Sequence, residues 1–93
     1  MIHFLVHDAT DNVGVAVVDL EAGTDCAGRN LTDQSQLSAH TQQAIPLGHK
    51  LALKNLKAGE EAVKYGCVIG VVVKDIAAGN HVHVHNLKTK RWV

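Results

Sequence analysis

The sequence predicts an all-β fold of short strands joined by glycine turns, and three observations lead to that prediction. β-Branched residues dominate the apolar segments, and glycines bound these segments. No window of a dozen residues keeps apolar side chains at the i, i+3, i+4, i+7 spacing of a helix. The 93 residues are enough for one small domain, which we place at residues 1–93. Because aromatic residues make up only 3% of the chain, its core must consist mainly of Val, Leu, Ile and Ala.

Four segments have the composition of short strands. Each is rich in Val or Leu, or alternates between apolar and polar residues, and turn-forming residues lie at its ends. These segments are 13–18, 51–53, 68–73 and 81–85.

Residues 33–44 are the one competing candidate for a helix. Their apolar positions, Leu37, Ala39 and Ala44, are too few to form a packed helical face. We therefore expect a strand or an ordered loop there. Pro46, the only proline, ends this segment and starts a turn.

A five-residue unit of the form [Asp/Asn]-[Leu/Ile]-x-Ala-Gly occurs three times, at residues 19–23, 55–59 and 75–79. In such a unit Asp or Asn opens a turn, the apolar residue points inward, and Gly supplies a position with positive φ. We interpret these units as architecture rather than as chemistry.

Charge and hydropathy exclude two classes of partner. Nine basic and nine acidic side chains give a formal net charge of zero, which is not the composition of a nucleic-acid-binding protein. The longest apolar run, residues 67–73, is far shorter than the roughly 20 residues of a membrane span. Residues 1–6 lack the basic flank and the cleavage site of a signal peptide. We expect a cytoplasmic protein with no nucleic-acid partner and no membrane partner.

The two cysteines, Cys26 and Cys67, do not have the spacing of a zinc ribbon or a disulfide framework. We expect both to be reduced and structural. Cys67 lies in the most apolar run of the chain, so we expect its thiol to be buried as a small apolar group.

Histidine is the unusual residue of this chain, with seven copies, and three of them form a His-x-His-x-His segment. In a strand, His81, His83 and His85 project from one side while Val82 and Val84 point into the core. Neighbouring histidines are then about 6.6–6.8 Å apart at Cα, so two of the three imidazoles could bind one metal ion.

A third metal ligand would have to come from another segment, and His49 is the natural candidate from this chain. Asp75 or a backbone carbonyl could accept a hydrogen bond from a ligating imidazole. The alternative stays open that the three histidines are solvated, or bond Asn86 and the backbone, without any metal.

Lys50, Lys64 and Tyr65 lie beside Gly48 and Gly66, where the backbone can approach a ligand closely. Either lysine could neutralise a carboxylate or sulfonate, although a single lysine is more often a solvated side chain. Tyr65 could instead cap the core before a turn. The sequence holds no nucleophile elbow, phosphate loop or dinucleotide fingerprint.

Four segments, in order, form a pattern that spans nearly the whole chain. They are Asp11-Asn12-Val13-x-Val15-Ala16, Ile45-Pro46-Leu47-Gly48-His49-Lys50-x-Ala52-Leu53, Lys64-Tyr65-Gly66-x-x-Ile69-Gly70 and Gly79-x-His81-Val82-His83-Val84-His85-Asn86. This pattern resembles the N-terminal SAF-type domain of the altronate and galactarate dehydratase family. Cys67 stands where that family often has a small residue or proline, which leaves the fold prediction unchanged.

The resemblance implies a β-clip fold and the β-elimination of water from a sugar acid by an enzyme that depends on a divalent metal, with iron(II) as the expected ion. The ending Thr89-Lys90-Arg91-Trp92-Val93 resembles that of separately encoded small subunits, including those of sulfolactate sulfo-lyase and split altronate dehydratases. We therefore expect a separate large catalytic subunit, with self-association of this chain left open.

Elimination requires removal of a proton α to a carboxylate and stabilisation of the charge that develops. On this basis we predict catalytic roles for His49 and Lys50, metal ligation by His81, His83 and His85, and substrate contacts from Lys64, Tyr65 and Asn86.

The predicted function is the small subunit of a lyase that dehydrates a hydroxy acid such as altronate, or acts on sulfolactate with release of sulfite. The rival hypothesis is a non-catalytic SAF-type module that binds a sugar acid or regulates a partner. A standalone enzyme is disfavoured because one thin domain offers little depth for a desolvated site.

Overall fold

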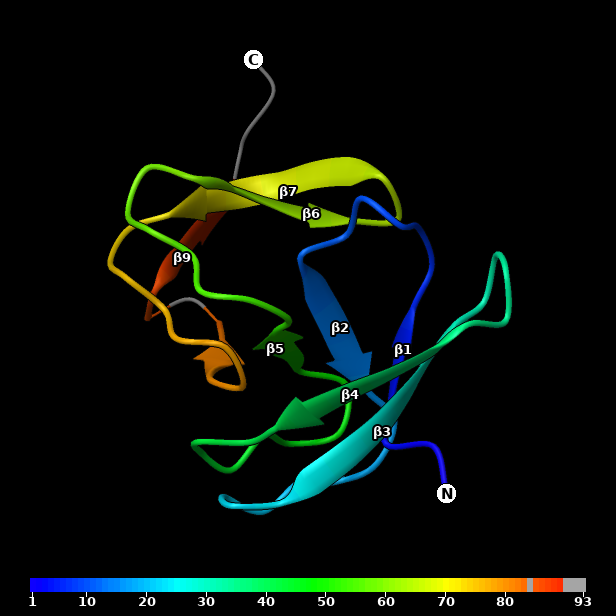
Figure 1. The fold of residues 1–93 in the computed structure, drawn as a ribbon. Helices are drawn as coiled ribbons and strands as arrows, with labels where there is room; N and C mark the ends of the chain where they lie inside the picture. The colour runs from blue at the N-terminus through cyan, green and yellow to red at the C-terminus, as the bar shows by residue number, and fades with distance from the viewer. Residues whose placement is uncertain (84, 90–93) are drawn as a thin grey trace.

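The computed structural model describes residues 1–83 and 85–89, and these residues form nine short strands and no helix (Figure 1). The all-β prediction is thus confirmed. The strands are β1 (Phe4–Val6), β2 (Val13–Ala16), β3 (Asp25–Asn30), β4 (Gln36–His40), β5 (Lys50–Ala52), β6 (Glu61–Lys64), β7 (Cys67–Val72), β8 (His81–Val82) and β9 (Leu87–Thr89). The segment at 33–44 contains strand β4, which is one of the two alternatives, a strand or an ordered loop, expected there. Among the described residues we find no helix with the length and apolar composition of a membrane span.

Two sheets make up the fold. The larger sheet has the order β4-β3-β1-β2-β5-β8, and the smaller sheet has the order β6-β7-β9. β1 and β3 pair in parallel, whereas the other neighbours are antiparallel. In β5, Lys50 lies opposite Val15 of β2 on one side and Val82 of β8 on the other. This pairing brings the segment around residue 49 beside the segment around residue 81.

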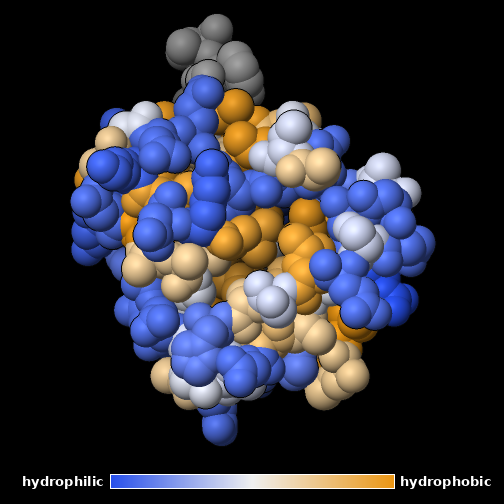
Figure 2. Space-filling model, in the orientation of Figure 1, coloured by the Kyte–Doolittle hydropathy of each residue, from blue (hydrophilic) through white to orange (hydrophobic). Residues whose placement is uncertain are grey.

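Two separate apolar clusters form the core. Leu51 and Ala52 of β5 are both fully buried and point to opposite faces of the larger sheet, so each joins a different cluster. The first cluster consists of Phe4, Val6, Ala16, Leu20, Cys26, Ile45 and Leu51. The second consists of Val13, Ala52, Leu56, Ala62, Val72, Ile76 and Val82. Apolar side chains also reach the surface in the middle of one face, over β1, β2 and β5, with polar residues around them (Figure 2).

Two of the repeated five-residue units, at residues 55–59 and 75–79, form turns that cap each other. Leu56 and Ile76 form a β-bridge at the centre of one pair. The Asn55 side-chain oxygen accepts a hydrogen bond from Ala78 N–H, and an Asp75 carboxylate oxygen accepts one from Ala58 N–H, each at 2.9 Å. The Asp or Asn of each unit therefore caps the turn of the other unit.

A fourth turn, at residues 44–48, pairs with the unit at 19–23. Leu20 and Ile45 form its β-bridge, and the Asp19 carboxylate accepts a hydrogen bond from Leu47 N–H at 2.8 Å. Ala44 stands at the capping position of this turn and has no oxygen to return the bond. Ala44 and Leu47 both depart from the five-residue pattern, so the sequence showed only three copies.

Two sequence-based expectations are corrected by the structure. The strand predicted at 81–85 ends after Val82, and residues 85–86 lie in a turn. Val82 is fully buried as predicted, whereas the prediction for Val84 falls outside the described residues. The prediction that Cys67 is buried is wrong. Cys67 begins β7 at the exposed end of a hairpin and belongs to neither of the two apolar clusters.

Candidate metal centre

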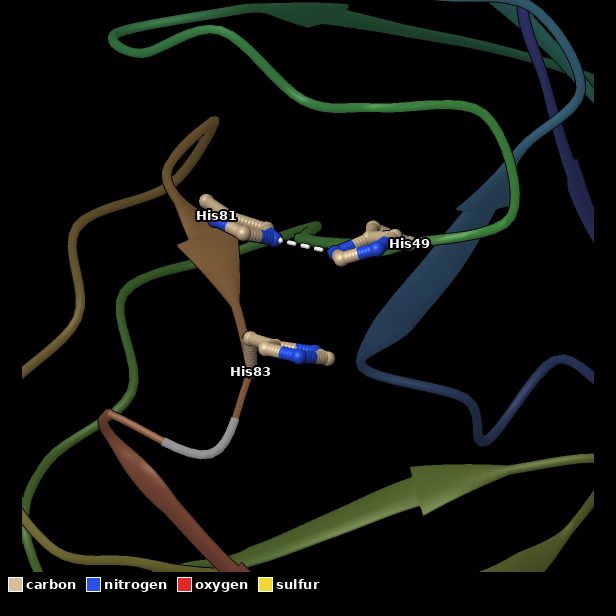
Figure 3. Close-up of side chains that lie close together, drawn as sticks. All are labelled: His49, His81 and His83. Carbon is tan, nitrogen blue, oxygen red and sulfur yellow. Dashed lines mark hydrogen bonds between the residues drawn. The ribbon is translucent and has the colours of Figure 1, made fainter.

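Three imidazoles meet at the edge where β5 pairs with β8 (Figure 3). His49 immediately precedes β5, His81 begins β8, and His83 follows that strand. The Nδ1 atom of His49 and the Nε2 atom of His81 share a hydrogen bond of 2.8 Å. One nitrogen from each of the three rings lies within 4.8 Å of the others, and all three residues are half-buried.

The backbone around His49 is held by the turn that precedes it. Gly48 adopts a φ of +85°, which returns the chain toward β5. His49 N–H donates to the Pro46 carbonyl at 2.9 Å, and the His49 carbonyl accepts from Ala16 N–H at 2.9 Å. Both backbone groups of His49 are thus paired, which leaves its imidazole free to point toward β8.

Two side-chain amides hold the segment that carries His81 and His83. The Gln43 oxygen accepts a hydrogen bond from His81 N–H at 3.0 Å, on the open edge of β8. The Asn86 side-chain oxygen accepts from His83 N–H at 2.9 Å, and its NH₂ group donates to the His81 carbonyl at 2.7 Å. Asn86 is only 5% exposed, so its amide is occupied by the loop that it closes.

The structure sorts the predicted metal ligands. His81 and His83 lie in the cluster, joined by His49 from the distant segment. His85 is exposed and outside the cluster, with its ring centroid 5.3 Å from that of His81. Asp75, considered as an acceptor for a ligating imidazole, instead caps the turn at Ala58.

The cluster disfavours protonation. Burial lowers the pKa of His81, and the positive charges that His49, His85 and His83 carry when protonated lower it further. Burial likewise lowers the pKa of His83, followed by the charges of His49, Lys50 and His85. Neutral imidazoles have a free nitrogen lone pair, which is the state that binds a metal.

The three side chains suit a metal that prefers nitrogen ligands. Their donor set consists of imidazole nitrogens alone, which favours ions such as iron, zinc or copper over magnesium or calcium. Three protein ligands also leave positions for a substrate oxygen. The residues present therefore fit a divalent transition-metal ion.

Lys50 follows His49 and lies close enough to the imidazole cluster for its charge to lower the pKa of His83. Burial lowers the pKa of Lys50, and the positive charge of Lys64 lowers it further. The ammonium group of Lys64 lies 4.7 Å from the centroid of the Tyr65 ring. No carboxylate forms an ion pair with either lysine within residues 1–83 and 85–89. Lys64 thus lies near Lys50 and over the Tyr65 ring.

Folding stability is expected to decrease as the pH falls below the ordinary histidine pKa of about 6.5. Because the pKa values of His81 and His83 are lowered in the folded state, the unfolded chain binds more protons in this range, and acid favours unfolding. Urea midpoints at about pH 8 and about pH 5 measure the effect. The difference between them should shrink in the double variant His81→Gln, His83→Gln, and an unchanged difference would contradict the prediction.

Replacing Asn86 with alanine is expected to lower the free energy of unfolding by about 2 kcal/mol, because it leaves His83 N–H and the His81 carbonyl without their partner. Urea denaturation measures the change. Asn80→Ala is the matched control, since the Asn80 oxygen has no hydrogen-bond partner among the described residues. A loss in Asn86→Ala no larger than in this control would contradict the prediction.

Comparison with known proteins gives a consistent picture. Residues 2–90 match the family described as the altronate/galactarate dehydratase SAF domain. The chain is 50% identical over 92 residues to the (2R)-sulfolactate sulfo-lyase subunit alpha of Chromohalobacter salexigens, with 98% of each chain covered. It is 51% identical over 61 residues to the protein of the same name from Paracoccus pantotrophus, covering 66% of this chain and 91% of that protein. It is 43% identical over 81 residues to the altronate dehydratase of Escherichia coli, covering 87% of this chain but 15% of that protein.

Proposed function

Because this chain belongs to the altronate/galactarate dehydratase SAF domain family, we propose that it is one subunit of a metal-dependent lyase that acts on a hydroxy acid. One observation carries the proposal: three half-buried imidazoles converge beside Lys50, and neither Lys50 nor Lys64 has a carboxylate partner among the described residues. Imidazoles that bind a metal and cations that bind acid groups are what elimination from a hydroxy acid requires.

Sulfolactate is the first candidate substrate. The similarity to the sulfo-lyase subunit extends over 98% of both chains. Sulfolactate has two acidic groups, a carboxylate and a sulfonate, and Lys50 and Lys64 offer two positive charges. Altronate has a single carboxylate and is the second candidate, supported by the similarity to altronate dehydratase.

Two groups of residues bind the metal and the substrate in this proposal. His49, His81 and His83 hold the metal, for which iron(II) fits the donor set. When bound, a divalent ion supplies Lewis-acid polarisation of a substrate oxygen. Lys50 and Lys64 bind the acid groups of the substrate and keep it in place.

Three further residues complete the site in this proposal. Tyr65 is 49% exposed, and its hydroxyl is available to a substrate oxygen. His85 is exposed beside the cluster and is the imidazole left to hold or move a proton. Asn86 has a positioning role instead of the predicted substrate contact, because its amide already bonds the backbone of His81 and His83.

A large partner subunit is part of the proposal. The altronate dehydratase relative is a much longer protein, of which this chain matches 15%, so most of that protein has no counterpart here. The apolar side chains in the middle of one face offer a surface that such a partner could cover (Figure 2). The cytoplasm remains the predicted compartment for the assembly.

Purification of the tagged chain from its native cells without oxygen tests the proposal. A large chain that copurifies, with sulfite release from sulfolactate or dehydration of altronate, is the expected result, and the active substrate decides between the two candidates. Recovery of the chain alone, with binding of a sugar acid in the absence of metal, would support the rival binding module instead.

A further inference from the structure

The carboxylate of Asp11 is the most heavily hydrogen-bonded side chain near the proposed site. One oxygen accepts from Gly66 N–H at 2.8 Å, and the other accepts from Tyr65 N–H at 3.1 Å. The second oxygen also accepts from His7 N–H and Asp8 N–H, each at 3.2 Å. One side chain thus joins the loop between β1 and β2 to the turn between β6 and β7, which lie beside each other in Figure 1.

That turn has a backbone conformation that needs support. Tyr65 has a φ of +55° and Gly66 a φ of +71°, as in the two-residue turns that close β-hairpins. Glycine adopts this region freely, whereas a tyrosine does not. Asp11 accepts from the N–H groups of both residues, so it stabilises the turn at the position where strain is greatest.

Asn12 fixes the same hairpin to the larger sheet. Its side-chain oxygen accepts from Val63 N–H at 2.7 Å, and its NH₂ group donates to the Glu61 carbonyl at 2.9 Å. The next residue, Val13, pairs with Ala52 of β5. The hairpin that carries Lys64 and Tyr65 is therefore held in a defined position relative to β5, which begins with Lys50.

The Tyr65 ring is packed on two sides by polar groups. The His7 ring meets it edge-on with a centroid separation of 3.9 Å, and Lys64 lies over it. Because Asp11 also bonds His7 N–H, the same carboxylate orders both the ring and its neighbour. Because none of these residues belongs to either core cluster, we expect the contacts of the turn to contribute little to the packing of the core.

We propose that Asp11 is a positioning residue that holds Lys64 and Tyr65 in a fixed place relative to β5, which begins with Lys50, and so sets the affinity for an acidic substrate without touching it. The inference rests on the proposed function. It predicts that Asp11 affects substrate binding more than turnover, because the residues it positions contact the substrate in the ground state as well as in the transition state.

Steady-state kinetics of the complex with its large subunit test this inference. Asp11→Asn keeps one acceptor oxygen but turns the other into a donor that faces N–H groups. Its KM should rise about fivefold or more while kcat stays within about twofold of the wild type. Asp8→Asn is the matched control: it removes the same charge from the same loop, but among the described residues the Asp8 carboxylate accepts hydrogen bonds only from Thr10, through N–H at 2.9 Å and the hydroxyl at 2.7 Å. Its KM should stay within about twofold of the wild type.

A double-mutant cycle separates positioning from a general loss of structure. If Asp11 acts through Lys64 and Tyr65, then Asp11→Asn should raise KM by a smaller factor in a Lys64→Met background than in the wild type. Fully additive effects overturn the inference, as does a KM for Asp11→Asn equal to that of Asp8→Asn. Should Asp11→Asn fail to fold, Asp11→Ser, which keeps one acceptor oxygen, takes its place. If neither folds, Asp11 is a folding determinant and the positioning role is rejected.

A measurement that needs no activity distinguishes failure of the inference from failure of the proposed function. Nuclear Overhauser contacts between the Tyr65 and His7 rings report the placement of the turn directly. They should persist in Asp8→Asn and disappear in Asp11→Asn. A wild-type complex that is inactive on both acids refutes the proposed function, whereas contacts that survive in Asp11→Asn refute the placement by Asp11.

Discussion

Replacing His83 with alanine is expected to lower kcat/KM of the assembled enzyme by about 100-fold or more, while the chain keeps its fold. His83 supplies one of the three converging nitrogens, and its ring stacks on that of His49 with a centroid separation of 4.4 Å. Two ligands bind a divalent ion much more weakly than three. The free energy of unfolding should change little, because the His83 ring belongs to neither core cluster. Enzyme kinetics and urea denaturation of the same preparation measure both effects.

His40→Ala is the control for the loss of a histidine. His40 lies on β4, where its exposed ring pairs with Asp25 at 2.7 Å, outside the cluster. Its activity should match the wild type. Activity that survives the combined replacement of His49, His83 and His85 by alanine would show that the site assignment is wrong.

Gly79→Ala is expected to lower the free energy of unfolding by about 3 kcal/mol or more. Gly79 has a φ of +85°, which alone disfavours an alanine. A methyl group there would overlap the His40 carbonyl oxygen and lie 2.9 Å from its carbon. Backbone must move, because Gly79 also bonds Ala52 and Gln42 through its own N–H and carbonyl groups.

The variant Gly59→Ala measures how much unfolding free energy is lost through the positive φ alone. Gly59 occupies the same place in the paired turn with a φ of +93°, and a methyl group there would meet nothing within 4 Å. We expect a loss of about 1 kcal/mol for Gly59→Ala. Urea denaturation of both variants measures the difference, and equal losses would show that the close approach to His40 costs nothing.

The imidazole cluster was partly predictable from the sequence. The alternation of His81, Val82 and His83 predicts two imidazoles on one side of a strand, and Val82 is indeed buried behind them. The contribution of His49 depends on the pairing of β5 with β8, which brings together residues that are distant in the chain. No local pattern encodes that pairing, so His49 could be named only as a candidate.

Other parts of the site depend on contacts that no spacing reveals. Gln43 bonds His81 N–H only because the segment after β4 crosses the edge of β8. The side-chain amide of Asn86 bonds the backbone of His81 and His83, and these bonds compete with strand pairing, so the strand predicted at 81–85 ends early. Alternating hydropathy does not reveal this competition. Asp11 was visible as part of a motif, but its four backbone partners belong to two turns far apart in sequence.

β8 has two residues and lies at the edge of its sheet, so we expect this part of the site to open locally. Short edge strands open locally at a smaller free energy than the whole domain needs to unfold. Amide hydrogens of residues 81–83 should therefore exchange with solvent faster than those of the central strands β1 and β2. Any ion that bridges His49 to His81 and His83 joins the edge strand to its neighbour, so it should slow exchange at β8 first and leave the rates in β1 and β2 almost unchanged.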